Sequence, residues 1–599
     1  MTSSAAEQEK SGPIRCLVIQ LARLGDTLQS LMALKAAKQL YPQLQIHFLA
    51  RERFADAAKR ISWIDEVITL PSDKILGPFI QGQKNQTEAL LDLSEWIQPL
   101  VKEPWDMLLN WSYSEASSYL TAILPATIKL GYTRAKDVQM ACADGWSHYM
   151  QAIVQGKVDQ NIHLTDILTT QLLTALQIHA GDPGDVGETP VNSKGFFNLK
   201  TVTHPFISQW RESTKKWVAF QLGAGRDDKA WPAEKFAELA EFIVSRHSDW
   251  NVVLLGGTDD RSREAQFFET LKGRLSDSSR IVSLVGQTQF DLWASVVSKV
   301  HWVIAADTSV VHLASVLGTR VLNLSIGPVQ WSETGPYGNG HLIIDVSNHG
   351  IPESEWVYAV WSHGVAERTQ VIERDFTQHL TQQIGEKALH SMKVMRSRIR
   401  PTQDGGGVVY EPLTAHALEL NEWSSTVMGQ IARAWFCGWV APIGHEINRD
   451  TISPDLIIEL RKLAESSEVL EKICNEAEKA ANELTKKSQK LHSDHLMSLD
   501  DKQVIQSIAL KMQELDKLID RMGQTQAPLR AFSQMSKVMM NNLSGEHLSE
   551  MGREGAICYK NLREGVKIFK EWVDFTLKMA RPRAVKSGFA PLVSIQNPN

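Results

Sequence analysis

Short apolar runs alternate with amphipathic stretches between Ile14 and Asp345, and this alternation is the main structural signal in the chain. The first series reads CLVIQL, DTLQSLMALKAAKQLY, QIHFLA, EVITL and DMLLNW. Apolar runs of strand length separated by stretches with helical spacing are typical of βαβ units and a parallel sheet. We therefore predict a Rossmann-like domain over residues 14–185.

A second series follows the polar stretch HAGDPGDVGETPVNSKG and repeats the same pattern. Its strand-like runs are WVAFQLG, NVVLLGG, IVSLVG, WVIAAD and RVLNLSIG, and its clearest helices are PAEKFAELAEFIVSRH and SVVHLASVLG. This pattern predicts a second Rossmann-like domain over residues 186–400, with a return helix at its end. Neither domain's first strand runs into G-x-G-x-x-G, so a dinucleotide-dependent dehydrogenase is disfavoured.

The chain changes character after PTQDGGG, which we interpret as a linker over residues 401–407. Residues 408–599 are predicted to form an all-α domain. Apolar or small side chains recur there at alternating spacings of four and three: Leu456, Leu460, Leu463, Ser467, Leu470, Cys474, Ala477, Ala481, Leu484, Ser488 and Leu491. The small and polar members favour an antiparallel bundle folded on itself, and a coiled coil that joins two copies is the alternative.

Two further helices are expected in this region. One follows a cap at Ser498 and carries a similar apolar series: Val504, Ile508, Met512, Leu515, Ile519 and Met522. The last, NLREGVKIFKEWVDFTLKMARPR, has large apolar side chains along one side and basic residues at its end: Val566, Phe569, Trp572, Phe575, Arg581, Arg583 and Lys586. Packing of this helix on the bundle is favoured, and a peripheral contact with an anionic membrane surface is the alternative.

Composition narrows the classes of function. The 599 residues carry 63 basic and 69 acidic side chains, so the net charge of −6 does not mark a nucleic-acid binder. No uninterrupted apolar run approaches the roughly 20 residues that cross a bilayer. The five cysteines lie far apart without a C-x-x-C pair, which fits a reducing compartment and predicts no metal cluster. Residues 1–13 lack the layout of a signal peptide, so we expect a disordered tail and a cytoplasmic protein.

Chemistry is expected in the loops that follow the strands, because open parallel sheets bind ligands beyond the carboxyl ends of their strands. The loop GAGRDDKAWP offers Gly223 and Gly225, whose backbone can approach a ligand, and the positive charge of Lys229. A lysine beside exposed amides at a helix start suits a phosphate group. A solvated charged loop is the alternative interpretation.

Two more loops of the second domain carry candidate groups. In ADTSVVHLASVLG, Asp307, Thr308 and Ser309 stand at a helix start, His312 lies one turn further on, and Gly318 ends the helix. These residues could hold a second face of the same phosphate, or they could be a helix cap and a core histidine. The loop GGTDD places Asp259 where an acid can accept hydrogen bonds from ribose hydroxyls.

The first domain supplies RLGDTLQS, in which Gly25 and Asp26 follow the first strand. Asp26 followed by Gln29 resembles a capping box, so a helix cap is one interpretation. The other is chemical, because a nucleotide held by the second domain would face this carboxylate across a cleft.

Together these stretches resemble glycosyltransferase family 9, the lipopolysaccharide heptosyltransferases. The resemblance covers about residues 14–345 in the family's order and spacing and rests on IRCLVIQLARLGDTLQSLMALKAAKQLYPQLQIHFLARERFA, QLGAGRDDKAWPAEKFAELA, LLGGTDD, LVGQTQFDLWASVVSKVHWVIAADTSVVHLASVLGTRVL and GPVQWSETGPYG. It implies the GT-B fold, with two Rossmann-like domains and a nucleotide-sugar donor, typically ADP-heptose, held mainly by the second. It further implies sugar transfer with inversion, without a tightly bound cofactor.

The resemblance also implies roles for single residues. Asp26 matches the acid that serves as general base, Lys229 the diphosphate-binding lysine and Asp259 the ribose-side acid. The donor motif D-[ST]-G-x-x-H matches Asp307, Thr308, Ser309 and His312, with Ser309 where the family has Gly. The predicted donor site is Gly223, Ala224, Lys229, Asp259, Asp307, Thr308, Ser309 and His312, and the predicted acceptor site is Gly25, Arg51 and Arg53.

Two function hypotheses follow. The leading one is an inverting glycosyltransferase that transfers heptose from ADP-heptose to a lipopolysaccharide core or another glycan, at the cytoplasmic face of the inner membrane. The rival is a catalytically reduced family member that acts as a scaffold through residues 408–599, which have no counterpart in the usual heptosyltransferases. Self-association would also use this helical region, and no nucleic-acid partner is expected.

Overall fold

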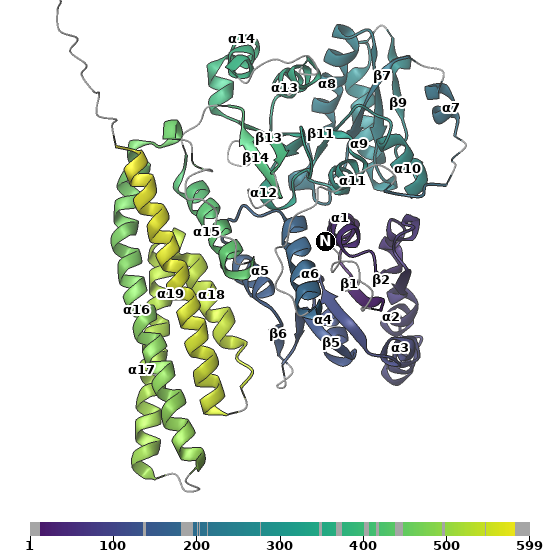
Figure 1. Ribbon diagram of the computed structural model, residues 1–599. Coiled ribbons are helices and arrows are strands. Elements are labelled where there is room, and N and C mark those ends of the chain that lie inside the picture. Colours follow the sequence, from purple (N-terminus) through teal and green to yellow (C-terminus); the bar gives the residue numbers. More distant parts are fainter. Residues whose placement is uncertain are drawn as a thin grey trace, which may run out of the picture.

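The computed structural model consists of two α/β domains and a helical bundle that lies beside the first of them (Figure 1). It describes residues 12–581 with the exception of 136–138, 181–195, 201, 203, 212–213, 276, 347–349, 367–373, 401–406, 415–417, 438–446, 448, 494–497 and 546. Most of the expected tail and linker, at residues 1–13 and 401–407, therefore falls outside the described residues.

The first domain is built on a six-stranded sheet in the order β3-β2-β1-β4-β5-β6, parallel except for β6. Its strands are β1 (Ile14–Gln20), β2 (Leu44–Arg51), β3 (Glu66–Leu70), β4 (Trp105–Asn110), β5 (Ala126–Arg134) and β6 (Met140–Cys142). Its helices are α1 (Leu24–Leu40), α2 (Ser72–Ile80), α3 (Gln86–Val101), α4 (Glu115–Ile123), α5 (Gly145–Gly156) and α6 (Leu164–Ala180).

The uninterrupted apolar run of β1 reflects its central position in this sheet. Cys16 and Val18 pack into the core beneath α1 and α6, whereas Leu17 and Ile19 pack into a separate core with residues of α3 and α4. A strand buried on both faces carries no polar alternation. The predicted parallel sheet of the first domain is thereby confirmed.

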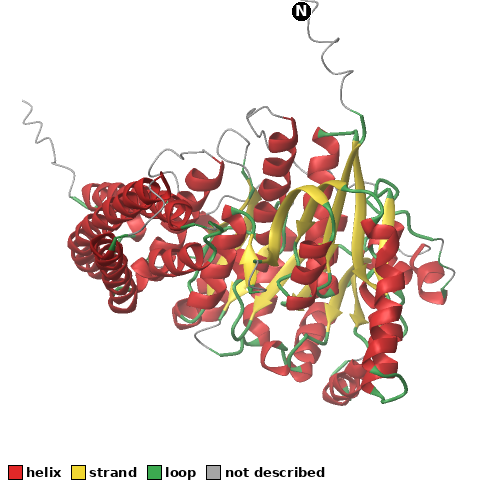
Figure 2. Cartoon of the chain, turned by 90° about the horizontal axis from the view of Figure 1, so that it is seen from below, coloured by secondary structure: helices red, strands yellow, loops and turns green. Residues whose placement is uncertain are grey.

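The second domain is built on an eight-stranded sheet in the order β14-β13-β12-β11-β10-β7-β8-β9, and helices pack on both of its faces (Figure 2). Its strands are β7 (Lys216–Gln221), β8 (Trp250–Leu255), β9 (Ile281–Ser283), β10 (Trp302–Ala306), β11 (Arg320–Ser325), β12 (Leu342–Asp345), β13 (Lys393–Ile399) and β14 (Val408–Pro412). Its helices are α7 (Pro205–Arg211), α8 (Ala233–Arg246), α9 (Arg261–Leu271), α10 (Phe290–Val297), α11 (Ser309–Leu317), α12 (Trp331–Thr334), α13 (Ser354–Ala366) and α14 (Arg374–His390). Two Rossmann-like domains in tandem, the arrangement of the GT-B fold, are confirmed.

The end of the second domain differs from the prediction in two respects. Val408–Pro412 form β14, which pairs with β13 in the antiparallel direction, so the region from 408 onward is not helical throughout. A return helix would cross back from the second domain to the first. None is found before residue 400 among the described residues, because α13 and α14 bury their apolar faces in the core of the second domain. The next helix, α15 (Leu420–Cys437), packs against α5 of the first domain.

The helical region is a bundle folded on itself. After α15 it consists of α16 (Pro454–Ser493), α17 (Leu499–Thr525), α18 (Arg530–Asn541) and α19 (Leu548–Met579), and α16 packs against both α17 and α19 (Figure 1). The apolar seam of α16 is buried within the same chain from Leu456 to Ser488, while the side chain of Leu491 lies outside the described residues. Ser498 caps α17 by accepting a hydrogen bond from Asp501 N. One position of the α17 series is wrong: Val504 is exposed, and the neighbouring Ile505 is buried instead.

The apolar side of α19 faces the bundle interior. Val566, Phe569 and Trp572 are buried, and Trp423 of α15 donates a hydrogen bond from Nε1 to Thr576 Oγ1 at 3.0 Å. The favoured interpretation, packing on the bundle, is therefore confirmed for this face, while Arg583 and Lys586 lie outside the described residues. Among the described helices, none is long and apolar enough to cross a membrane.

The bundle and the first domain share one core. Trp146 and Tyr149 of α5 lie in the same cluster of buried side chains as the bundle helices, and Cys142 N of β6 donates a hydrogen bond to Asn542 Oδ1 at 2.7 Å. The extension is thus fixed to the first domain through a buried apolar interface.

Candidate functional site

The amino-terminal ends of α1 and α11 meet where the two domains face each other. A Cβ atom built on Gly25 would lie 3.0 Å from His312 Cδ2 and 3.9 Å from Ser309 Cα. Each helix follows the carboxyl end of a central strand, β1 in the first domain and β10 in the second. Two helix starts with their positive dipole ends at one place form a favourable environment for an anion.

Asp26 lies in the first turn of α1, but it is not the residue that precedes the helix. The helix begins at Leu24, after Arg23, and Asp26 Oδ2 accepts a hydrogen bond from Arg23 N at 3.1 Å. The capping box predicted to start at Asp26 is therefore wrong in register, although the carboxylate does cap the helix from its third position. Asp26 is half-buried beside the junction of the two helices.

Lys229 and Asp307 come together across the carboxyl edge of the second sheet. Lys229 Nζ donates to Asp307 Oδ2 at 3.2 Å, and Thr334 Oγ1 of α12 lies 3.5 Å from Asp307 Oδ1. The loop that carries Lys229 is anchored by Trp231, which is fully buried and donates from Nε1 to Pro352 O at 3.0 Å. The predicted lysine and the predicted acid are therefore neighbours, held in place by a packed indole.

His312 is buried at the junction of the two domains and is uncharged at neutral pH. Burial lowers its pKa to about 4, against the opposing effect of Asp307 and Asp26. Its Nε2 lies 3.4 Å from Gln29 Nε2 of α1. His312 can therefore offer packing and a hydrogen bond to a ligand but not a positive charge. It is a buried residue, and its role in a donor site stays a prediction.

The loops after β7 and β8 are packed tightly on each other by Asp260. Its Oδ2 accepts from Gly257 N at 2.8 Å, and a Cβ atom on Gly223 would lie only 2.0 Å from its Oδ1. Gly223 is buried and Ala224 half-buried in this arrangement, whereas Asp259 is exposed and its side chain does not line the cavity described below. The ribose-binding role of Asp259 stays a prediction.

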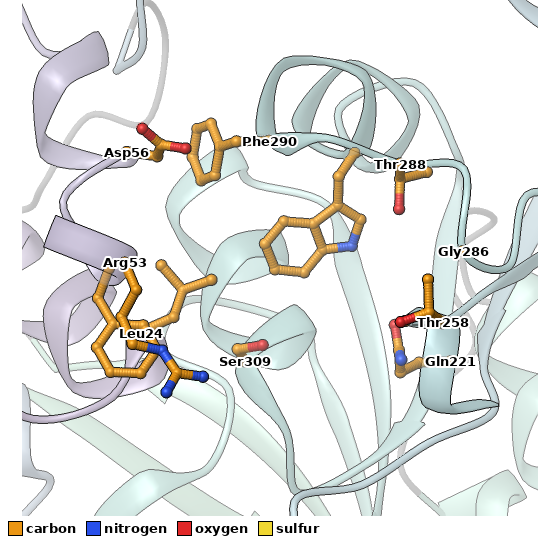
Figure 3. A pocket seen from close by; sticks show the side chains of 13 residues that line it. Leu24, Arg53, Asp56, Gln221, Thr258, Gly286, Thr288, Phe290 and Ser309 are labelled. Atoms are coloured by element: carbon orange, nitrogen blue, oxygen red, sulfur yellow. The ribbon is translucent and has the colours of Figure 1, made fainter. Parts of the chain in front are cut away.

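A cavity of about 450 Å³ opens between the domains. Figure 3 shows Leu24, Arg53 and Asp56 of the first domain on one side, and Thr258, Gln221 and Ser309 of the second domain opposite and below. The complete lining is Leu24, Arg53, Phe54, Asp56, Gln221, Gly256, Gly257, Thr258, Gly286, Thr288, Phe290, Trp293 and Ser309. The candidate residues Ser309 and Arg53 thus reach one cavity, while Arg51 is exposed and does not line it.

The aromatic wall of this cavity was not predicted. It comes from the segment GQTQFDLW after β9, which supplies Gly286, Thr288, Phe290 and Trp293. The signal was available, because this segment also follows a parallel strand at the same edge of the sheet. The segment carries few charged side chains, so its sequence does not indicate a binding site as a lysine or an aspartate would.

The two domains are joined by further contacts. Arg60 of the first domain forms a two-pronged ion pair with Asp291, with Arg60 Nη2 at 2.6 Å from Asp291 Oδ2. On the other side of the junction, Tyr337 OH donates to Asp166 Oδ1 at 2.7 Å. Nearby, burial raises the pKa of Glu333 to about 7. The two domains are therefore joined by polar contacts on two sides of the cavity.

Comparison with known protein families identifies this architecture. Residues 94–355 match the model of glycosyltransferase family 9 (heptosyltransferase). The chain contains a glycosyltransferase family 9 domain. The helical bundle is not matched by the family 9 model.

The proteins to which this chain is similar are also heptosyltransferases. The lipopolysaccharide core heptosyltransferase OpsX of Haemophilus influenzae is 21% identical over 369 residues, which cover 60% of this chain and 94% of the relative. Lipopolysaccharide heptosyltransferase 1 of Escherichia coli K12 is 21% identical over 338 residues, covering 55% of this chain and 93% of the relative. With this family 9 domain the protein is a heptosyltransferase-like glycosyltransferase.

Solved structures of family 9 proteins also resemble the chain. The family 9 glycosyltransferase of Veillonella parvula is 18% identical, with a TM-score of 0.41, over 63% of this chain and 96% of that one. The E. coli heptosyltransferase WaaC with ADP is 17% identical, with a TM-score of 0.38, over 54% of this chain and 91% of that one.

Proposed function

We propose that the protein transfers heptose from ADP-heptose to a hydroxyl group of a lipopolysaccharide core or another glycan, with inversion at the anomeric carbon. The observation that carries this proposal is the meeting of two helix starts, one from each domain, beside Lys229 and Asp307. An anionic leaving group between the domains would be held there by backbone amides and an ammonium group. The names of the similar proteins support a heptose as the sugar.

In the proposed reaction Asp26 is the general base. The acceptor oxygen forms a bond to the anomeric carbon from the face opposite the diphosphate, and its proton passes to the Asp26 carboxylate. The bond between the anomeric carbon and the phosphate oxygen breaks, and its electron pair stays on the departing diphosphate. General base catalysis by a positioned carboxylate contributes typically about 10²–10⁴-fold.

The second domain would stabilise the leaving group. Lys229 would neutralise charge that develops on the diphosphate, and Asp307 orients the Lys229 ammonium group through the contact at 3.2 Å. The remaining proposed donor contacts are made by Gly223, Ala224, Asp259, Thr308, Ser309 and His312.

The first domain would bind the acceptor. Arg53, which lines the cavity, and Arg51 at the end of β2 would attract an anionic or phosphorylated glycan. Gly25 allows the start of α1 to approach His312 of the second domain closely, because a larger side chain would collide with that ring. Because such acceptors are lipid-linked, we propose that the enzyme works at the cytoplasmic face of the inner membrane through peripheral contact.

The test is direct. The purified full-length protein is incubated with ADP-heptose and a lipopolysaccharide-core acceptor, and ADP release and sugar transfer are both measured. We expect ADP release to depend on the acceptor and to be lost in Lys229→Ala. UDP- and GDP-sugars serve as controls for the donor, and the absence of transfer from ADP-heptose would contradict the proposal.

A second candidate function is a scaffold with reduced activity. It is favoured by Ser309, whose side chain lines the cavity at the position of the family's Gly, and by the large bundle fixed to the first domain. Such a protein would bind ADP-heptose without turning it over, and would retain a partner or a second copy on the bundle. Acceptor-dependent ADP release would contradict this candidate.

A further inference from the structure

Arg23 is a cation of the first domain that reaches the donor loop of the second. It is the residue before α1, and its backbone is held on both sides: its N–H donates to Asp26 Oδ2, and its carbonyl accepts from Thr27 N. Its guanidinium extends across the cleft, where Nη1 lies 3.5 Å from the position of a Cβ atom on Gly225. Gly225 belongs to the same loop as Lys229.

The acids of the loop that carries Gly225, and the acid at the start of α11, are paired with other cations. Asp228 pairs with Arg226 at 2.5 Å, Asp227 with Arg263 at 2.7 Å and Asp307 with Lys229 at 3.2 Å. Within the part of the chain that the structure describes, the Arg23 side chain forms no hydrogen bond or ion pair. The exposed Arg23 guanidinium is therefore available to an anionic ligand that enters the cleft.

The position of Arg23 relative to the reacting groups indicates which part of the donor it would contact. Arg23 directly precedes Leu24, which lines the cavity, and is three residues from Asp26. If Asp26 accepts the proton of the acceptor, the bond that breaks lies close to the start of α1. The part of the donor nearest to Arg23 is then the outer phosphate, which carries that bond, rather than the nucleoside.

We propose that Arg23 binds the outer phosphate of the nucleotide-sugar donor from the acceptor side of the cleft, opposite Lys229. This inference rests on the proposed function. A guanidinium presents parallel N–H donors that match two oxygens of one phosphate. As the bond between the sugar and the phosphate oxygen breaks, the electron pair adds negative charge to that phosphate, and Arg23 stabilises this charge. Because Arg23 and Lys229 come from different domains, a donor bound by both also holds the domains together.

The experiment compares ADP with AMP, since only ADP has the outer phosphate. Binding of both nucleotides to the full-length protein is measured by calorimetry for the wild type, Arg23→Gln and Arg23→Lys. We expect Arg23→Gln to weaken ADP binding about 10- to 100-fold, the range of one charge-assisted contact, and AMP binding less than about 3-fold. Arg23→Lys should recover part of the loss, because it keeps the charge but not the two parallel donors.

The matched control is Arg521→Gln, which removes the same charge from an exposed arginine on α17 of the bundle. It should leave binding of both nucleotides unchanged. With ADP-heptose and acceptor, Arg23→Gln should lower kcat at least about 10-fold, with partial rescue by lysine, because the contact strengthens as charge develops.

The outcomes separate the two proposals. Wild-type protein that does not bind ADP would contradict the proposed donor itself. Wild-type binding of ADP with equal binding by Arg23→Gln, or an equal loss for ADP and AMP, would overturn the role of Arg23 and leave the proposed function standing.

Discussion

A single methyl group at Gly25 would disturb the contact between the two domains. A Cβ atom there would lie 3.0 Å from His312 Cδ2, whereas carbon atoms in favourable contact are about 3.5–4.0 Å apart. Gly25→Ala must therefore push α1 away from α11 by about half an ångström. Gly25→Val places two more carbon atoms at the same junction and should open it further.

The cost should appear in turnover rather than in stability. Alanine is a better helix former than glycine by up to about 1 kcal/mol, so α1 itself is not weakened. Misplacement of reacting groups by about 1 Å can cost about 10²-fold in rate, so we expect kcat/KM to fall about 10-fold in Gly25→Ala and about 10²-fold or more in Gly25→Val.

The assay is ADP release from ADP-heptose with acceptor, together with the Tm of each variant. Gly77→Ala is the matched control, because Gly77 lies in α2 and its Cβ atom would meet nothing within 4 Å. Turnover of Gly25→Val at the wild-type rate would refute the reasoning that the two helix starts must touch during the reaction.

Three further predictions concern the cavity, the bundle and the joint between the domains. Ser309→Gly, which restores the family's residue at the cavity wall, should lower KM for ADP-heptose in steady-state assays, and a raised KM would show that the hydroxyl contributes to binding. Trp572→Ala removes an indole that is 2% exposed, so the free energy of unfolding should fall by about 3–5 kcal/mol in urea titrations; a change below about 1 kcal/mol would contradict the buried packing of α19. Burial raises the pKa of Glu333 to about 7, so its contribution to stability is present at low pH and is lost as pH rises from about 4.5 through about 7. Glu333→Gln should therefore gain stability relative to the wild type over this pH range, measured as the difference in Tm, and a difference independent of pH would contradict the burial of this carboxyl group.

The two α/β domains are well predicted because the burial of each strand and helix leaves a pattern in its own few residues. Each central strand is a continuous apolar run, and the helices that follow β1 and β10 begin with Gly, Asp or Thr. The edge elements are harder. β14 was predicted on the helical side of the linker, because pairing with β13 depends on a partner strand rather than on the five residues themselves.

The candidate site shows the same limit. Lys229 and Asp307 are 78 residues apart, and only the order of strands β7 and β10 in the sheet brings them together. Gly25 and His312 face each other across a domain boundary, which no local pattern encodes. The helix begins at Leu24, because the Asp26 carboxylate accepts a hydrogen bond from Arg23 N from within the first turn. In the sequence, an aspartate in this position looks the same as an aspartate that precedes the helix.

The central claim is that the carboxylate of Asp26 takes the acceptor proton opposite a donor held by the second domain. Asp26→Asn tests it most directly, because the amide oxygen can still accept the hydrogen bond from Arg23 N and so preserve the cap, which is worth about 1 kcal/mol. The measurement is the rate of heptose transfer at saturating ADP-heptose, with ADP affinity measured on the same protein. We predict a loss of at least about 10²-fold in transfer with unchanged ADP binding. A transfer rate close to that of the wild type would contradict the claim and would leave Asp26 with a structural role in capping α1.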